Sequence, residues 1–293
     1  AHQEGFGVHD FNIRRGRRQS TSTSFLRPVR HRKNLTVLTR ARATRILFEG
    51  RRAVGLEYLH GGQLKQARAT REVVLSGGAV NSPALLELSG IGPAARLQAL
   101  NIPVVADLPG VGENLQDHLG IFVQHDCLQP ITLYGLFRPD RAALIVLRAI
   151  VFGTGPAASM PLEASGYFRS RPELELPDMK CALVPGLSLE TNRRGQQRHG
   201  FQVTVHQLRP ESRGSVHIQI ADPVAKPAIQ PNYLSAEMDV RTMRDAVKIV
   251  RQLLAQRSFE PFRGKELAPG EAVQSDEAIE DWVRREGRTV FHP

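Results

Sequence analysis

The chain has 293 residues, enough to bury a large hydrophobic core in one or two domains. Hydrophobic residues make up 41% of it, as in ordinary globular proteins, and no apolar run is long enough to span a membrane. The two cysteines, Cys127 and Cys181, form neither a metal-ligand spacing nor a disulfide framework. We therefore expect free thiols, a cytoplasmic location and no metal site. Because the first residue is Ala1 rather than Met, the presence of a leader upstream stays open.

The formal net charge is +10, and much of the positive charge falls in residues 14–33. Such a charge raises the hypothesis of nucleic-acid binding. No helix-turn-helix, zinc or aromatic-rich RNA-binding pattern accompanies the basic residues, so a solvated, arginine-rich surface is the simpler interpretation. We expect neither a nucleic-acid partner nor a transmembrane segment.

The first predicted regular elements are strands. Residues 1–33 are irregular and polar, whereas residues 43–48 and 53–58 are rich in strand-forming side chains. Gly50 lies between these two runs, and the pair Gly61-Gly62 follows them. The pattern predicts a small antiparallel meander.

The next pattern is a turn between a predicted strand and a predicted helix. Residues 73–75 form a short apolar run typical of a strand buried on both faces. Ser76, Gly77 and Gly78 then allow a tight turn whose backbone amides stay uncovered. Ser82 stands where an N-cap is expected, with a proline at the first helical position. Free amides at a helix start can hold a phosphate, although many turns of this kind hold nothing.

The second half of the chain predicts helices mixed with antiparallel strands. Residues 141–152 form a mostly apolar helical run of about three turns. Residues 201–208 alternate as a half-buried strand. Ser275 stands at the N-cap of a last helix, whose apolar side includes Ile279 and Trp282.

Two longer strings are more specific than any of these local patterns. Residues 78–86 read Gly-Ala-Val-Asn-Ser-Pro-Ala-Leu-Leu and soon run into Leu-Ser-Gly-Ile-Gly-Pro. Residues 107–118 read Asp-Leu-Pro-Gly-Val-Gly-Glu-Asn-Leu-Gln-Asp-His. Both resemble segments of the glucose–methanol–choline (GMC) family of flavin oxidoreductases, in its choline and alcohol dehydrogenase-like branch. Residues 210–216 and 231–234 resemble segments of the same family, so the resemblance covers nearly the full chain.

The resemblance implies an α/β fold with an α+β substrate-binding part. It assigns residues 1–33 and 118–290 to the substrate domain and residues 34–117 to the FAD-binding domain, and residues 291–293 start the active-site segment. No Gly-x-Gly-x-x-Gly follows a strand, and no flavin-contacting segment follows residue 293. The resemblance therefore implies an internal part of a longer enzyme, without its N-terminal dinucleotide-binding βαβ unit and its C-terminal segment.

The implied cofactor is FAD. The resemblance places Ala43 against the adenine and makes the turn and helix start a cofactor-binding region, comprising Ser76, Gly77, Gly78, Asn81 and Ser82. Glu163 matches a strand that lines the substrate cavity, although an ion pair with an arginine is the simpler interpretation. His118, beside Asp117 on a turn, is expected to be a structural hydrogen-bonding residue.

The residue expected to act in catalysis is His292, which falls on the family's active-site histidine, with Phe291 in place of the usual tyrosine. The resemblance implies oxidation of a primary alcohol to an aldehyde, with His292 as general base and the hydride passing to flavin N5. The electron acceptor could be oxygen, a quinone or another carrier. We expect this chain alone to be inactive. Two alternatives stay open, namely a degenerate non-catalytic relative and a basic polyanion-binding module.

Overall fold

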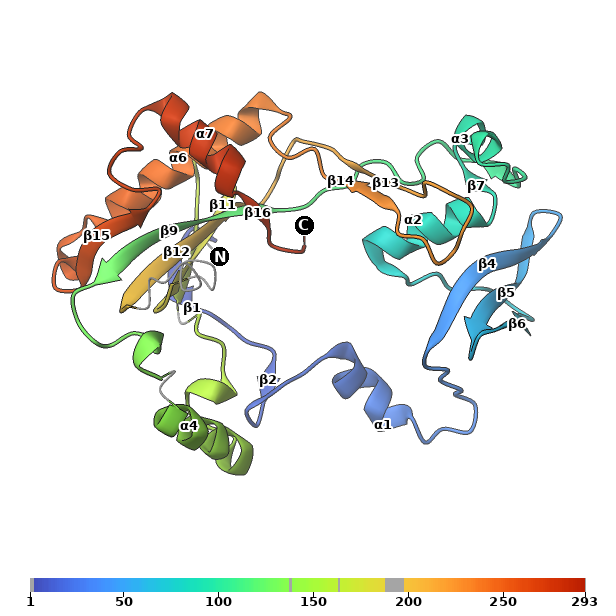
Figure 1. Cartoon of the computed structure of the whole chain (residues 1–293), viewed down its shortest axis with the longest axis horizontal. Helices are drawn as coiled ribbons and strands as arrows, with labels where there is room; N and C mark the ends of the chain where they lie inside the picture. Colours follow the sequence, from blue (N-terminus) through green and yellow to red (C-terminus); the bar gives the residue numbers. More distant parts are fainter. Residues whose placement is uncertain (1–2, 137–138, 163, 188–197, 293) are drawn as a thin grey trace. The chain divides into compact units, whose positions relative to one another are not determined.

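The computed structural model describes residues 3–136, 139–162, 164–187 and 198–292. The chain divides into two compact units (Figure 1). Unit 1 comprises residues 1–31, 117–211 and 236–293, and unit 2 comprises residues 32–116 and 212–235. Residues 212–235 therefore belong with the segment predicted to bind FAD, whereas the sequence assigned them to the substrate part.

Unit 1 is built on an antiparallel sheet, seven-stranded within the described residues, with the order β1-β10-β11-β12-β9-β15 and β16 as a further partner of β9. These strands come from three separate stretches of sequence, so the sheet is assembled by long-range pairing. Their bounds are β1 Gly5–Val8, β9 Leu119–Cys127, β10 Ala164–Phe168, β11 Met179–Val184, β12 Gly200–Gln207, β15 Arg263–Ala268 and β16 Arg288–Thr289. Strands β2 (Ile13–Arg14) and β3 (Arg17–Arg18) follow β1 in the sequence and pair with each other as a small antiparallel hairpin.

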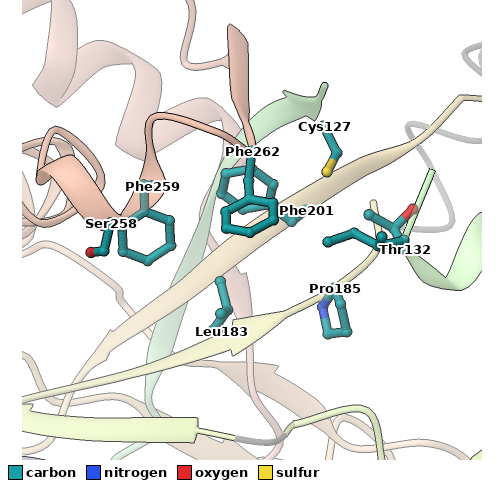
Figure 2. A pocket seen from close by; sticks show the side chains of 9 residues that line it. Cys127, Thr132, Leu183, Pro185, Phe201, Ser258, Phe259 and Phe262 are labelled. Carbon is teal, nitrogen blue, oxygen red and sulfur yellow. The ribbon is translucent and has the colours of Figure 1, made fainter. Parts of the chain in front are cut away.

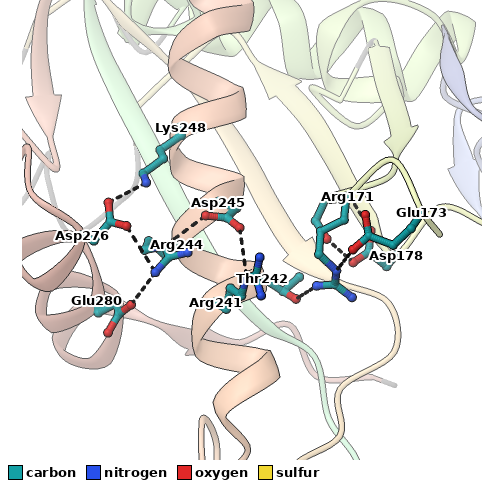
Figure 3. A network of polar contacts seen from close by, with 11 residues as sticks. Arg171, Glu173, Asp178, Arg241, Thr242, Arg244, Asp245, Lys248, Asp276 and Glu280 are labelled. Carbon is teal, nitrogen blue, oxygen red and sulfur yellow. Dashed lines mark hydrogen bonds and ion pairs between the residues drawn. The ribbon is translucent and has the colours of Figure 1, made fainter.

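Helix α6 (Glu237–Leu254) packs against β9 and β12, and α7 (Asp276–Glu286) packs on α6 (Figure 1). The hydroxyl oxygen of Ser275 accepts a hydrogen bond from the Ala278 amide at 3.2 Å, so the predicted cap of α7 is confirmed. Polar side chains also join the two helices (Figure 3), among them Lys248 of α6 and Asp276 of α7, whose Nζ and Oδ1 are 2.5 Å apart.

Unit 1 also contains helix α4 (Pro139–Phe152) and several short helices. Helix α4 confirms the helix predicted at residues 141–152. The short helices are Ser22–Leu26, α1 Arg27–Val29, Leu133–Leu136, Pro156–Ala158 and Arg257–Phe259. Across the described ranges, no helix is both long enough and apolar enough to cross a bilayer.

Strand β12 is buried on both faces, although its alternation predicted a half-buried strand. Val203 and Val205 are on one face and pair with Val123 and Ile121 of β9, forming part of the hydrophobic core. The other face carries polar residues that are also buried, including His206, which is 9% exposed. Strand β12 pairs with β11 on one edge and β9 on the other, and helix α6 packs against it and helps to bury its side chains.

Unit 2 contains the predicted meander, and this prediction is confirmed. Strands β4 (Ala41–Glu49), β5 (Arg52–His60) and β6 (Gln63–Arg68) pair in antiparallel order. The other elements are α2 Gly78–Leu88, β7 Ile91–Gly92, α3 Ala94–Ala99, β8 Ala106–Asp107, β13 Ser215–His217 and β14 Ala228–Gln230. A small core of Ala84, Leu97, Ile102 and Ile218 joins α2 to the residue after β13, which explains why residues 212–235 belong to this unit.

The strand predicted at residues 73–75 is wrong, because these residues form no strand and Val74 is 75% exposed. A buried strand needs neighbours, and the described part of unit 2 offers this segment none. The predicted helix start is wrong as well. Gly77 is the N-cap of α2, so Ser82 and Pro83 lie inside the helix, where Pro83 gives up one backbone hydrogen bond.

Both cysteines are free, as the sequence predicts. Cys181 is buried in β11 and Cys127 is half-buried at the end of β9. Burial raises the pKa of the Cys181 thiol to about 11, so this thiol stays protonated and unreactive at neutral pH.

Candidate active site

Three histidines from distant parts of the sequence meet at one end of the unit 1 sheet. His118 precedes β9, His206 lies near the end of β12, and His292 follows β16. Backbone pairing brings them together, because His206 and Arg288 are both register partners of Gly120, one on each side of β9. We call this group the histidine cluster.

The imidazole rings of the histidine cluster are in mutual contact. The ring centroids of His118 and His206 are 5.2 Å apart, and these two rings are stacked at 25°. The ring of His292 stands nearly perpendicular to both, at 5.2 Å from His118 and 5.8 Å from His206. The backbone holds this arrangement, since the His118 amide donates to the His292 carbonyl at 3.1 Å and the Val290 amide donates to the His118 carbonyl at 3.0 Å.

The hydrogen bonds define the tautomer of His118. Its Nε2 lies 3.1 Å from the Leu208 carbonyl oxygen, and because a carbonyl only accepts, Nε2 carries the proton. Nδ1 of His118 is then left with a lone pair. Within the described residues, this Nδ1 and Nε2 of His206 are buried and have no hydrogen-bond partner.

Burial keeps the two inner histidines uncharged. It lowers the pKa of His206 to about 3, and the neighbouring His118, Lys180 and His292 act in the same direction. Burial also lowers the pKa of His118, against the opposing effect of its hydrogen bond to Leu208. Both imidazoles are therefore neutral at pH 7.

Gly120 makes the close approach of the C-terminal segment possible. A Cβ at this position would lie 2.7 Å from Cγ1 of Val290, closer than real Cβ atoms come to other heavy atoms. The absence of a side chain lets residues 290–292 run directly over the start of β9.

The third member of the histidine cluster is open to solvent. His292 is exposed, and Phe291 before it is 89% exposed with a φ of +65°. Phe291 lies in the left-handed region, which a bulky side chain rarely adopts, and its amide donates to Oγ1 of Thr289 at 2.8 Å. The cluster therefore combines two buried, neutral imidazoles with one accessible imidazole, a set of groups suited to taking up a proton.

The residues predicted to bind the cofactor lie in unit 2, five of them around the start of α2. Gly77, Gly78 and Asn81 are exposed, and no side chain caps the first helical amides, which leaves them free to bind an anion. A Cβ on Gly77 would lie 3.2 Å from the backbone nitrogen of Ser82, so the backbone at the helix start is closely packed against the next turn. Ala43 is half-buried in β4, and α2 packs on β4. The structure thus brings five of these residues together at the start of α2, and their binding of a cofactor stays a prediction.

A buried polar network fixes α2 against β13. The carboxylate of Glu87, 0% exposed, accepts from Nδ1 of His217 at 2.7 Å and from the Ile218 amide at 2.8 Å. The other ring nitrogen of His217 lies 2.9 Å from Oε1 of Glu113. The network is internal and structural, and the sequence analysis missed it because its members lie more than 100 residues apart.

The predicted substrate residue Glu163 lies outside the described residues. A cavity of about 290 Å³ is present in unit 1, lined mainly by apolar residues such as Leu183, Phe201 and Phe262 (Figure 2). It lies at the Cys127 end of β9, roughly 25–30 Å along the strand from His118. The residues that line this cavity include no carboxylate and no imidazole, so the histidine cluster is the better candidate site.

His292 was predicted as the base from the sequence, and that role stays a prediction, whereas His118 was expected to be structural and no sequence signal indicated His206. His118 has the expected structural hydrogen bond, but its ring also belongs to the histidine cluster. His206 ends an alternating strand with no motif around it. Only the pairing of β12 with β9 could have revealed it.

Unit 1 is thus an antiparallel sheet with a histidine cluster at one end, and unit 2 presents a helix start without a side-chain cap. Sequence models described as GMC oxidoreductase match residues 1–120 and 210–293, well over half of the chain. The chain therefore belongs to the GMC oxidoreductase family, which confirms the resemblance seen in its signature segments. FAD is the cofactor that fits this family.

The curated relatives are choline dehydrogenases. The chain is 46% identical over 291 residues to mitochondrial choline dehydrogenase of Mus musculus, covering 99% of this chain and 49% of the relative. It is 44% identical over 292 residues to the oxygen-dependent choline dehydrogenase of Chromohalobacter salexigens, covering 99% and 52%. The chain thus spans about half the length of the curated relatives it matches.

Solved structures show the same fold. Pyridoxine 4-oxidase from Mesorbium loti superposes with a TM-score of 0.82 at 26% identity, over 99% of this chain and 53% of that one. Formate oxidase from Aspergillus oryzae superposes with a TM-score of 0.89 at 24% identity, over 99% and 55%. The mixed helix-and-strand GMC fold predicted from the sequence is confirmed.

Proposed function

We propose that the whole protein oxidises a primary alcohol to an aldehyde with FAD, and that His292 takes the hydroxyl proton. The observation that carries this proposal is the histidine cluster, in which an accessible imidazole stands against two buried, neutral ones. Family membership supports the redox chemistry, and the relatives' names support an alcohol as substrate.

The three histidines are proposed to have different roles in proton transfer, with His292 as the base and His118 and His206 as its neutral neighbours. Imidazole titrates near neutral pH and so suits a general base at physiological pH. His118 and His206 add no positive charge beside His292, so they do not oppose its protonation as two imidazolium ions would. The bond from His118 to the Leu208 carbonyl and the backbone pairing of residues 118 and 290–292 hold the base in place.

The residues present fit the cofactor. The uncapped amides at the start of α2 are proposed to hold an FAD phosphate, with Ser76, Gly77, Gly78, Asn81 and Ser82 around it. Ala43 is proposed to face the adenine. When bound, FAD supplies the hydride acceptor that no protein side chain can provide.

The test uses the product of the whole gene, purified with its flavin. In the His292→Ala variant, anaerobic bleaching of the flavin absorbance by alcohols should slow by about 10²–10⁴-fold, the usual effect of losing a general base. The exposed His31 serves as the control, and the His31→Ala variant should reduce its flavin at the parent rate. Equal rates in the parent and His292→Ala would remove His292 from the mechanism.

Choline is the first primary alcohol to test, and oxygen the first acceptor, because relatives 42–46% identical are named choline dehydrogenases, several of them oxygen-dependent. A protein that takes up no FAD would instead support the degenerate, non-catalytic relative. This chain by itself is proposed not to turn over, since it carries no Gly-x-Gly-x-x-Gly fingerprint. The cytoplasmic location and the absence of a nucleic-acid partner stay predictions.

A further inference from the structure

We propose that His118, His206 and His292 together bind one divalent transition-metal ion, Zn²⁺ foremost, through one imidazole nitrogen each. The sequence predicted no metal site, since the two cysteines have no metal-ligand spacing and the three histidines are far apart in the chain. The proposed site exists only in the folded unit 1.

The distances suit three nitrogen ligands on one ion. One ring nitrogen from each histidine lies within 4.8 Å of the other two. Tetrahedral Zn²⁺ with bonds of about 2.0–2.1 Å holds neighbouring nitrogens roughly 3.4 Å apart. Closing the cluster around the ion therefore needs side-chain shifts of roughly 1 Å.

Two buried nitrogens are available as ligands. Nδ1 of His118 and Nε2 of His206 have no hydrogen-bond partner within the described residues, and these side chains are only 5% and 9% exposed. A buried polar atom without a partner is unfavourable, so a bound ion would stabilise both. His118 has the outer contact typical of metal-binding histidines, because its Nε2–H donates to the Leu208 carbonyl while Nδ1 keeps its lone pair.

The ligand set also selects the ion. Three imidazole nitrogens favour Zn²⁺, Ni²⁺, Co²⁺ or Cu²⁺, whereas Mg²⁺ and Ca²⁺ prefer oxygen ligands. Two nearby charges have opposite effects on a cation, since the Asp117 carboxylate attracts it and the Lys180 ammonium repels it. The exposure of His292 leaves a route for entry and a fourth position for water.

Metal binding has a consequence that rests on the proposed function. A lone pair of His292 that is bound to an ion cannot accept the proton of an alcohol. Zn²⁺ is therefore expected to inhibit alcohol oxidation over the same concentration range in which it binds.

The test measures binding separately from activity. The whole gene product, freed of any polyhistidine tag, is titrated with Zn²⁺ by calorimetry, and the bound metal is counted after gel filtration. One ion per chain is expected in the parent. His118→Gln, His206→Gln and His292→Ala should each weaken binding at least about tenfold, whereas His31→Ala should bind like the parent.

The exposed His292 is the decisive position, because its replacement leaves the buried packing intact even if the two inner variants fail to fold. Zn²⁺ binding that is unchanged in His292→Ala would overturn the proposal, as would the lack of saturable binding in the parent. If the protein binds Zn²⁺ but oxidises no alcohol, the proposed function is wrong and the metal site is supported. If the protein oxidises alcohols but binds no Zn²⁺, the metal site is wrong and the proposed function is supported.

Discussion

At the scale of single residues, buried polar side chains hold segments together that are far apart in the sequence. His118 is bonded to the carbonyl of Leu208, 90 residues away, and Glu87 is bonded to His217, 130 residues away. Each of these side chains has a defined partner, which offsets the free energy of removing it from water. A polar residue of this kind determines which segments can pack together, in addition to stabilising the fold.

Replacing Glu87 by leucine should destabilise unit 2 strongly. The change leaves Nδ1 of His217 and the Ile218 amide buried without their acceptor, and each buried donor left unsatisfied in this way costs about 1–3 kcal/mol. The free energy of unfolding from urea titration measures the loss. Glu113→Gln is the matched control, because Glu113 faces the same imidazole but its side chain is 48% exposed, so about 0–1 kcal/mol is expected. Equal losses in both variants would contradict this account of Glu87.

Adding one methyl group at Gly120 should destabilise unit 1 through a single contact. In Gly120→Ala the new Cβ would meet Cγ1 of Val290, and overpacking of this kind costs about 1–3 kcal/mol. The double variant Gly120→Ala with Val290→Ala should recover most of this loss, because the second change removes the colliding methyl group. Thermal unfolding of the two single variants and the double variant gives the coupling between the sites. Strictly additive effects would show that the clash is not the cause.

At the scale of elements, short sequence patterns predicted a helix or strand correctly where the contact that stabilises it joins residues close together in the sequence. Ser275 caps α7 through the Ala278 amide three residues away, and both the cap and the helix were predicted from the sequence. The strand expected at residues 73–75 depends instead on neighbouring strands, and the described residues provide none. Helix α2 begins at Gly78, before the proline that was expected to mark its first residue.

The contact between α7 and α6 should make stability depend on pH. The hydrogen bond from Lys248 holds the pKa of Asp276 below its ordinary value of 3.8, and the charge of Arg244 adds to the effect (Figure 3). A lowered folded-state pKa means that folding favours the ionised carboxylate. The contribution is therefore complete above pH 3.8 and is lost as the pH falls through the folded-state pKa.

Asp276→Asn should accordingly lower the unfolding midpoint at about pH 6 and have a shrinking effect as the pH falls below the ordinary pKa. Melting curves of parent and variant over this range test the expectation. Asp281 lies on the same helix and serves as the control for removing a carboxylate from α7. A difference between Asp276→Asn and the parent that stays constant down to pH 2 would rule out the carboxylate's charge as its source.

At the scale of the whole molecule, each compact unit is made of segments that are not consecutive in the sequence. Unit 1 is assembled from three segments and unit 2 from two, and each unit has its own buried residues. The histidine cluster draws on two of the three segments of unit 1, because His118 and His206 belong to residues 117–211 and His292 belongs to residues 236–293. Each of the three lies near the end of a different strand. The division at residues 212–235 could not be foreseen, since it depends on Glu87 and on the packing of Ile218 beside α2.

The sequence by itself determined the family, the mixed helix-and-strand fold and the identity of His292 as the candidate base. These follow from strings of consecutive residues, such as residues 78–86 and 107–118, whose order is specific enough to identify a family. It also determined the cap of α7 at Ser275 and the meander, whose interacting groups lie close together in the sequence. Short-range patterns of this kind survive in the linear sequence because the interacting groups are neighbours along the chain.

Only the tertiary structure decided which side chains surround His292. His118 and His206 reach it through strand register, and a shift of one residue would turn their side chains to the opposite face. Their neutral state also depends on burial, which is a property of the folded sheet. The base could be identified from consecutive residues, whereas its environment, and with it the proposed metal site, depends on pairings between strands more than 70 residues apart.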